Sequence, residues 1–533
     1  MESLAILSRR LTQRFSEVRL PWLWAISLCL LLGIGLRWLR LDQMVFWHDE
    51  VFTALRVTGH LGDQVAAQLF TGEPIAASAI LQYQTFAPGS TFADTWRSLI
   101  DHPEHPPLFY LLGWVWVKVF GTSVTAFRSL SALISTVTFL ALPGLAWELF
   151  AIREAAILAP LLFAVSPVHL LYAQEARQYA LWTLVTVLAT WALRRAVRLQ
   201  RWRAWGTYAV CLSLTFYTSV LSLTIVMAHG IYGLLVLSQR QRHRFVLAIA
   251  AAGLLFMPWL LVMALNRQQW QSATDWTTVV SYPLDVLVKL WGLHFTAVFF
   301  DPNLPLEHPY SWLVPPLFVL LLLGILLSLL RSLSKESSVL VLTLVLVPTV
   351  CILGGDWVRG SVLSRNTRYF MPALIGCLVA MAGWLGLQYQ YRRRAVLWGV
   401  ALLLGLGLTS SWAILQAPAW WSKGFNYHNR TIAAAINEWP QPTVLTQAHE
   451  TTLGNVISLS YYLAPETTWV ITQSPELPQV PTAGQTVLLF EPTEQLLAQF
   501  ACLPEALPVP GGLFRVACEA GDRSTGRLPS SQS

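Results

Sequence analysis

Charged residues are scarce in this chain of 533 residues, at 12% of the total, whereas hydrophobic residues make up 55%. Soluble domains carry about twice that share of charge, so the composition excludes an ordinary soluble domain. Apolar runs long enough to cross a bilayer recur along the sequence, which indicates a polytopic α-helical membrane protein. The net charge of +7 does not indicate nucleic-acid binding, because the basic residues lie in short loops beside the apolar runs.

Two further absences narrow the class of membrane protein. The apolar segments contain no series of Asp, Glu or Lys, which a proton-coupled pump would require. The two halves show no inverted repeat of the kind found in many transporters.

Cysteines number only six, and Cys502 and Cys518 could form a disulfide if the C-terminal tail is extracytoplasmic. The first apolar run lacks a small-residue cleavage site, so we expect a signal anchor there.

The basic clusters predict the topology. Arginines before the first apolar run predict a cytoplasmic N-terminus, and the loop 41–106, with eight acids and two arginines, is expected outside. These anchors and the apolar runs together predict about eleven spans, which also places the C-terminus outside. The expected spans lie near residues 20–38, 127–147, 153–171, 176–197, 204–219, 220–238, 245–264, 311–331, 338–354, 369–388 and 395–416.

Two other apolar segments, 107–120 and 282–300, are expected not to span. The first has about 14 residues, which is short for a span. Counting either segment as a span would also reverse the predicted side of every later loop. We therefore expect a transmembrane domain at 1–416, which includes a first extracytoplasmic loop with juxtamembrane helices at 41–126.

The tail at 417–533 has a different character and predicts a small extracytoplasmic α/β domain. Its last Ser- and Gly-rich residues are expected to be disordered. The expected helices lie at 431–439 and 494–500, and the expected strands at 443–447, 456–462, 468–472, 486–490 and 514–518.

Four polar clusters fall on the outer face in this topology. The first is His48-Asp49-Glu50, directly after the first span. A charged side chain at the bilayer centre costs about 2.5–3.5 kcal/mol, so these carboxylates belong at the rim or in a wet cavity. In a helix, Asp49 and Arg56 would share one face. A purely structural alternative is a surface helix whose N-terminus is favoured by the acids.

The second cluster, residues 101–107, includes Glu104 and His105 and ends in two prolines that suit the first turn of a helix from Leu108. Its histidines and carboxylates leave a divalent metal open, but their spacing matches no metal signature. A rigid, solvated loop is the alternative interpretation.

The third cluster contains Glu175, Arg177 and Tyr179 in a turn between two apolar runs. These residues either form a solvated hairpin turn or line the same cavity as Asp49. Because charge is so scarce in the chain, the second interpretation is slightly favoured.

The fourth cluster contains Arg365, Arg368 and Tyr369. Positive charge on the outer side opposes the usual topological bias. The planar guanidinium donor suits a phosphate group, whereas the alternative is that these arginines reach lipid headgroups.

These motifs, taken in order, resemble the GT-C fold glycosyltransferases. The likeness is to the family 39/83-like group of protein mannosyltransferases, aminoarabinose transferases and Rgt-type relatives, and it covers about the first 200 residues. It rests on the acidic pair after the first span, on His-Pro-Pro-Leu-Phe-Tyr-Leu-Leu at 105–112, on Phe120-Gly121 with Ala126-Phe127-Arg128-Ser129-Leu130, on Ser166-Pro167 and on residues 174–179. Residues 368–372, Arg-Tyr-Phe-Met-Pro, are similar to a late-span motif of the same group.

The resemblance implies an enzyme that transfers a sugar from a polyprenyl-phosphate donor to a lipid, glycan or protein acceptor on the outer face of the cell membrane. Asp49 is then the catalytic base of an inverting displacement, with Glu50 in support. The residues expected to bind substrate are Arg56, Glu104, His105, Glu175, Arg177, Tyr179, Arg365, Arg368 and Tyr369.

Some features of the sequence limit this interpretation. Aminoarabinose transferases have Lys-Pro-Pro where this chain has His105-Pro-Pro, so a hexose or pentose donor is favoured over aminoarabinose. A lipid or polysaccharide flippase would require ionisable groups within the spans or repeated halves. An O-antigen ligase would have its largest loop late in the chain, whereas here the largest internal outer loop is the first.

Overall fold

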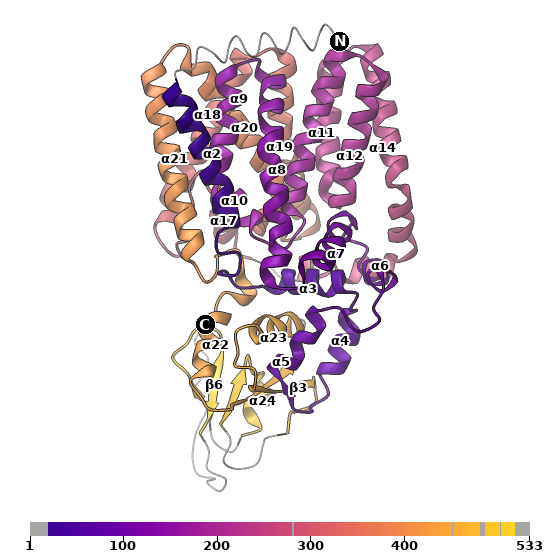
Figure 1. Ribbon diagram of the computed structural model, residues 1–533, viewed down its shortest axis with the longest axis vertical. Helices are drawn as coiled ribbons and strands as arrows, with labels where there is room; N and C mark the ends of the chain where they lie inside the picture. Colours follow the sequence, from indigo (N-terminus) through magenta and orange to yellow (C-terminus); the bar gives the residue numbers. More distant parts are fainter. Residues whose placement is uncertain (1–19, 280–281, 450, 480–485, 501–502, 518–533) are drawn as a thin grey trace.

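The computed structural model describes residues 20–279, 282–449, 451–479, 486–500 and 503–517. Long helices run side by side in one half of the molecule, and a smaller part that contains a β-sheet lies against one end of this bundle (Figure 1). We call that end the sheet end of the bundle.

Within the described residues, seven helices are long and apolar enough to cross a membrane. They are α8 (Val124–Phe150), α11 (Tyr179–Leu199), α14 (Gln239–Leu265), α18 (Tyr310–Ser332), α19 (Lys335–Arg359), α20 (Met371–Tyr389, preceded by the 3-10 turn Thr367–Phe370) and α21 (Arg393–Gln416). A bent pair of helices would make eight. The expected number of about eleven spans is therefore not confirmed.

Shorter helices occupy the remaining predicted spans and the two segments expected not to span. Over its described residues, none of them is both long and apolar enough to cross a membrane. They are α2 (Leu20–Trp38), α12 (Trp202–Thr218) and α13 (Leu223–Val236) in predicted spans, and α7 (Leu108–Phe120) and α17 (Leu284–Thr296) in the other two segments.

The third predicted span is broken rather than continuous. It consists of α9 (Arg153–Ala164) and α10 (Pro167–Ala173), which meet at an angle of 59°. Pro167 has no backbone N–H, and its ring disfavours a helical conformation at Ser166, so the helix ends there. The buried Arg37 guanidinium donates to the freed carbonyls of Phe163 and Ala164, at 2.7 and 3.0 Å. The break directs the chain into the polar turn before α11.

The first loop forms several short elements at the sheet end of the bundle. They are α3 (His48–Thr58), α4 (Gly62–Leu69), β1 (Ile75–Ala76), α5 (Ala77–Ile80) and α6 (Phe92–Asp101). The two acids in the first turn of α3 interact favourably with the helix dipole. The helix ends at Gly59, whose φ of +86° suits glycine.

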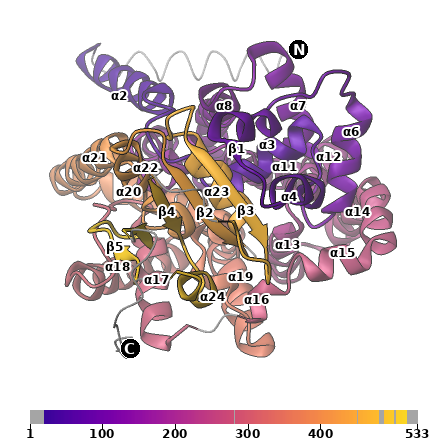
Figure 2. The ribbon, with the colours of Figure 1, turned by 90° about the horizontal axis from the view of Figure 1, so that it is seen from below.

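The sheet has six strands in the order β1-β3-β2-β4-β6-β5. Its members are β1, β2 (Thr443–Ala448), β3 (Thr468–Gln473), β4 (Val487–Phe490), β5 (Glu505–Ala506) and β6 (Leu513–Val516). The central strands β3, β2 and β4 are parallel, whereas β1, β5 and β6 pair antiparallel. Figure 2 shows this sheet across the end of the bundle.

Most C-terminal helices and strands overlap segments expected from the sequence, but β5 was not expected and one expected strand is a helix instead. The strand expected at 456–462 is wrong, since most of it belongs to α23 (Thr452–Ser460). Parallel strands β2 and β3 require a crossover, which this helix provides. The two expected helices are present as α22 (Asn429–Asn437) and α24 (Glu494–Ala498).

Two C-terminal expectations fall on residues outside the described ranges. They are the disulfide between Cys502 and Cys518 and the disorder of the last Ser- and Gly-rich residues.

The short helices α15 (Arg267–Ser272) and α16 (Trp276–Val279) follow α14.

The first loop and the tail share one apolar core. Phe46 and Leu55 from the first loop, Tyr110 from α7, and Val456 and Trp469 from the tail are all buried in the same cluster. In addition, β1 of the first loop pairs with β3 of the tail. The residues expected as two separate outer segments therefore pack together, and their junction with the bundle positions the polar clusters.

Candidate active site

Glu50 lies at the centre of a buried ion pair. Its carboxylate receives hydrogen bonds from Arg128 Nε and Nη2, at 2.7 and 2.6 Å, and both side chains are almost fully buried. The backbone N–H of Ala176 also donates to Glu50 Oε1, at 2.7 Å. Glu50 therefore joins α3 to α8 and to the turn before α11.

Arg128 uses its remaining donors on the backbone that leads into α3. Its Nη1 donates to the carbonyls of Leu41 and Met44, and its Nη2 to that of Val45, at 2.7 to 2.9 Å. The sequence motif around Arg128 was noted, but nothing in the sequence pointed to this partner. A single arginine thus fixes both the start of α3 and its second acid.

Asp49, the neighbouring acid, faces arginines from two other parts of the chain. Its Oδ2 lies 2.9 Å from Arg368 Nη1 and 3.8 Å from Arg177 Nε. Burial alone would raise the pKa of Asp49, but the charges of Arg368 and Arg177 bring it down to about 2. The carboxylate is therefore ionised at neutral pH, and 16% of its side chain remains exposed.

The third cluster is folded against α3. Arg177 is buried and donates from Nη1 to the hydroxyls of Thr53 and Tyr110, at 3.1 and 3.2 Å. Its guanidinium also lies 5.8 Å from the ring of Tyr179. Thr53 and Tyr110 are contacts that the sequence analysis missed. Arg177, expected near Asp49, is thus brought there by the turn that follows the broken helix.

Glu175, the acid of the same turn, contacts a residue that the sequence analysis did not select. Its Oε2 pairs with Lys423, which lies after α21 and is itself buried. Lys423 also stands over the ring of Trp47, at 4.4 Å. Burial lowers the pKa of Lys423 to about 7. The sequence did contain one signal that could have selected Lys423: lysine occurs only four times in the chain.

The two arginines of the fourth cluster point to different places. Arg368 contacts Asp49 and lies 5.3 Å from the rings of both Trp47 and Tyr369. Arg365 instead bonds to the hydroxyl of Tyr282. The structure brings Arg368 and Tyr369 next to Asp49, whereas Arg365 makes no ion pair within the described residues.

Arg56 is buried without a counter-ion among the described residues. Its side chain is only 6% exposed, and its Nε has no hydrogen-bond partner there. Its guanidinium lies 5.7 and 5.9 Å from the ring centroids of Phe52 and Tyr110. The shared helical face predicted for Asp49 and Arg56 does not lead to an ion pair, because Arg368 and Arg177 take the carboxylate.

The second cluster lies beside α7. Glu104 Oε1 stands 3.6 Å from nitrogens of both His102 and His105, and Glu104 Oε2 has no hydrogen-bond partner in the part of the chain that the structure describes. Burial, followed by the charges of Arg56 and Arg177, holds the pKa of His105 well below its usual value. No group of three or more His, Cys, Asp or Glu in the described ranges is arranged to hold a metal ion.

His48 connects this site to the tail. Its backbone N–H donates to Asn426 Oδ1, at 2.6 Å, and its ring rests against α23. A Cβ on Gly454 would lie 2.1 Å from His48 Nδ1, so only glycine allows this approach. Burial lowers the pKa of His48 to about 4, which leaves the ring neutral at neutral pH.

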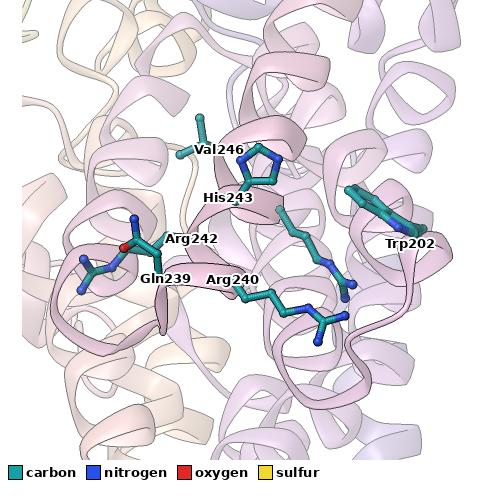
Figure 3. A pocket seen from close by; sticks show the side chains of 7 residues that line it. Trp202, Gln239, Arg240, Arg242, His243 and Val246 are labelled. Atoms are coloured by element: carbon teal, nitrogen blue, oxygen red, sulfur yellow. The ribbon is translucent and has the colours of Figure 1, made fainter.

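A separate basic pocket lies at the start of α14, at the bundle end opposite the sheet. Figure 3 shows its lining side chains, among them Trp202, Arg240 and His243. None of the site residues expected from the sequence lines it. Clustered arginines at this end are typical of a cytoplasmic face.

Comparison with known proteins connects this geometry to a fold. Residues 104–270 match the family described as dolichyl-phosphate-mannose-protein mannosyltransferase, a stretch that includes Glu104 and His105 of the second cluster and all of the third. A comparison with curated proteins gave no match.

Among solved structures, ArnT from Cupriavidus metallidurans bound to undecaprenyl phosphate is similar, with a TM-score of 0.52 and 13% identity over 90% of this chain and 95% of that one. The same protein in the apo state gives a TM-score of 0.53 and 12% identity over 90% and 94%. The apo oligosaccharyltransferase of Archaeoglobus fulgidus gives 0.48 and 14% over 85% and 65%.

The likeness to ArnT extends over almost the full length of both chains. It shows that this protein has the GT-C fold, as the ordered motifs predicted. The structure places the expected site residues at the sheet end of that fold. Their part in substrate binding stays a prediction.

Proposed function

We propose that this protein is a membrane glycosyltransferase that moves a sugar from a polyprenyl-phosphate donor to an acceptor hydroxyl. The observation that carries the proposal is the pairing of one ionised carboxylate, Asp49, with Arg368 and Arg177, on a helix whose Arg56 is buried without a counter-ion among the described residues. This arrangement has a base for the acceptor and surplus positive charge for a phosphate. The solved relative with undecaprenyl phosphate supports a donor of that class.

The reaction is a single displacement at the anomeric carbon. The acceptor oxygen forms a bond to that carbon while its proton passes to an oxygen of Asp49. The bond between the anomeric carbon and the phosphate oxygen breaks, and polyprenyl phosphate leaves with the bonding electrons. A carboxylate with a pKa of about 2 serves because the acceptor hydroxyl becomes acidic only as the new bond forms. The configuration of the sugar is inverted.

The arginines provide charge for the leaving group. A phosphate in the site would offer Arg368 a second anionic partner and would loosen its hold on Asp49. Arg56, buried with no counter-ion among the described residues, supplies a further positive charge. Fixed charges of this kind stabilise the negative charge that develops on a leaving phosphate. Glu50 and Glu175 act indirectly, since their own ion pairs hold α3 and the turn in place.

Replacing Arg56 by glutamine should raise the KM for the donor about 10- to 100-fold, as expected for loss of a hydrogen bond to a charged group. The KM for the acceptor should change little. Steady-state kinetics with each substrate varied in turn would measure both. The matched control is Arg97→Gln, because Arg97 is 75% exposed and lies on the same loop. An unchanged donor KM in Arg56→Gln would contradict this role.

The function is tested by sugar transfer in liposomes that contain the purified protein, a panel of hexosyl and pentosyl polyprenyl phosphates and a membrane-extract acceptor mixture. Transfer from any of these donors supports the proposal, and the active donor names the sugar. Failure with every donor would reject it and return attention to a flippase.

The proposal requires the site to face away from the cytoplasm. In a background with Cys502 and Cys518 replaced by serine, a membrane-impermeant maleimide should label Gln473→Cys in intact cells, because Gln473 is exposed at the end of β3. Gln239→Cys, at the opposite end of the molecule, should react only after permeabilisation. The reverse pattern would overturn the proposed orientation.

A further inference from the structure

The sheet has a topological switch point between β2 and β4. These strands are parallel neighbours. The chain leaves β2 through α23 toward β3 on one side, whereas it leaves β4 through α24 and β5 toward β6 on the other. In open α/β sheets, ligands bind at the carboxyl ends of the strands where the connections diverge in this way.

Polar side chains gather at this switch point. His449 directly follows β2, and Glu491 directly follows β4, with His449 Nε2 and Glu491 Oε2 3.6 Å apart. Both side chains are accessible, at 43% and 29% exposure. The buried Asn455 of α23 donates to Glu491 Oε2, at 3.0 Å, so the carboxylate is fixed while it still faces solvent.

Glu491 also has an unusual backbone. Its φ of +46° is in the left-handed region, which non-glycine residues seldom occupy. Its backbone N–H donates to Gly512 at 2.9 Å, which helps to hold this conformation. The position of the Glu491 carboxylate is therefore set both by its backbone conformation and by its hydrogen bond from Asn455.

A continuous chain of hydrogen bonds leads from this point to the candidate active site. Asn455 Oδ1 accepts from Asn426 Nδ2 at 2.9 Å, and Asn426 Oδ1 accepts from the backbone N–H of His48 at 2.6 Å. Asn426 and Asn455 are both buried. The next residue along the chain from His48 is Asp49. A ligand at Glu491 would thus contact a residue that buried hydrogen bonds connect to His48, the neighbour of the proposed base.

An exposed aromatic ring lies along this path. Phe425 is 46% exposed, and its ring centroid is 5.6 Å from that of His48. Its ring centroid also lies 5.9 Å from the guanidinium of Arg365. An exposed aromatic beside polar hydrogen-bonding groups offers both an apolar face and directional contacts.

We propose that His449, Asn455 and Glu491, together with Phe425, form a saccharide subsite that holds a sugar of the acceptor. A carboxylate accepts hydrogen bonds from two neighbouring sugar hydroxyls, and an imidazole either donates or accepts. The C–H face of a pyranose packs on an aromatic ring. This inference rests on the proposed transferase function and specifies its acceptor as a glycan.

Direct binding tests the subsite without any transfer reaction. Saturation-transfer NMR on the full-length protein in detergent would use methyl mannoside, methyl glucoside, methyl galactoside and N-acetylglucosamine as probes. At least one should bind, and Glu491→Gln should weaken that binding about tenfold, as for loss of a charge-assisted hydrogen bond. Glu494→Gln is the control, because it removes the same charge from an exposed position three residues later. Absence of binding by every probe, or equal binding by Glu491→Gln and wild type, would overturn the proposal.

A second comparison separates the subsite from the transfer reaction. Asp49→Asn should bind the saccharide as wild type does, whatever its transfer rate. Glu491→Gln should raise the KM for the acceptor while the KM for the donor stays the same. If transfer fails with every donor but Glu491→Gln still loses saccharide binding, the proposed reaction is wrong and the subsite stands.

Discussion

Replacing Asp49 by asparagine should lower the rate of sugar transfer about 10²- to 10⁴-fold, the usual contribution of a general base. Asparagine has almost the same shape but cannot accept the proton of the acceptor hydroxyl. It also leaves Arg368 and Arg177 without their shared carboxylate. The measurement is initial-rate transfer in liposomes with the active donor, at saturating concentrations of both substrates.

Two controls make this result specific to the base. Asp63→Asn removes a charge from an exposed acid of the same loop and should leave the rate unchanged. Donor binding by Asp49→Asn, measured without an acceptor, should persist or become tighter, because the arginines are then free for the phosphate. Transfer at the wild-type rate by Asp49→Asn would remove Asp49 as the base and direct the search to Glu104, whose Oε2 has no hydrogen-bond partner among the described residues.

Replacing Glu50 by glutamine should destabilise the fold by about 3–5 kcal/mol, since breaking a buried ion pair leaves an uncompensated charge. Arg128 would keep its backbone partners but lose both charge-assisted bonds to Glu50. Thermal unfolding followed by tryptophan fluorescence would show the loss as a lower Tm.

A double-mutant cycle identifies the cause of that loss. Arg128→Met should also destabilise, and Glu50→Gln combined with Arg128→Met should cost much less than the sum of the two. Asp94→Asn is the control, because Asp94 belongs to the surface pair with Arg97, and such pairs contribute about 0–1 kcal/mol. Additive losses for the pair at Glu50 would mean that Arg128 is stabilised by its carbonyl contacts alone.

Local sequence patterns predicted many of the helices and strands. Apolar runs marked every long helix of the bundle, and short runs rich in β-branched and apolar residues marked β2, β3 and β4. They failed for α23, because this helix is the crossover between two strands whose parallel pairing is a long-range property. They also failed for β1, where two residues gain strand geometry only from β3 of the distant tail.

The candidate site was likewise predicted only in part: the sequence identified residues of the site but not their contacts. Scarcity of charge in an apolar chain was enough to select Asp49, Arg177 and Arg368, which the fold then brings into contact. The scarcity of charged residues does not reveal which of them form ion pairs with one another. The ion pair of Glu50 with Arg128 and that of Glu175 with Lys423 join residues 78 and 248 positions apart. Such contacts depend on how the helices pack, which no local pattern determines.

The strand pair of β1 and β3 also sets an order of events during synthesis. Ile75 lies opposite Trp469, so the ribosome must add 469 − 75 = 394 residues before this pair can form. At about 5–20 residues per second, that delay is roughly 20–80 s. Through that interval the first loop, already emerged, has none of its tail partners, and Phe46 and Leu55 lack part of their apolar cover. The nascent protein thus exposes apolar surface at this loop until the tail is made, and only then is the candidate site complete, since Lys423 and Asn426 belong to the tail.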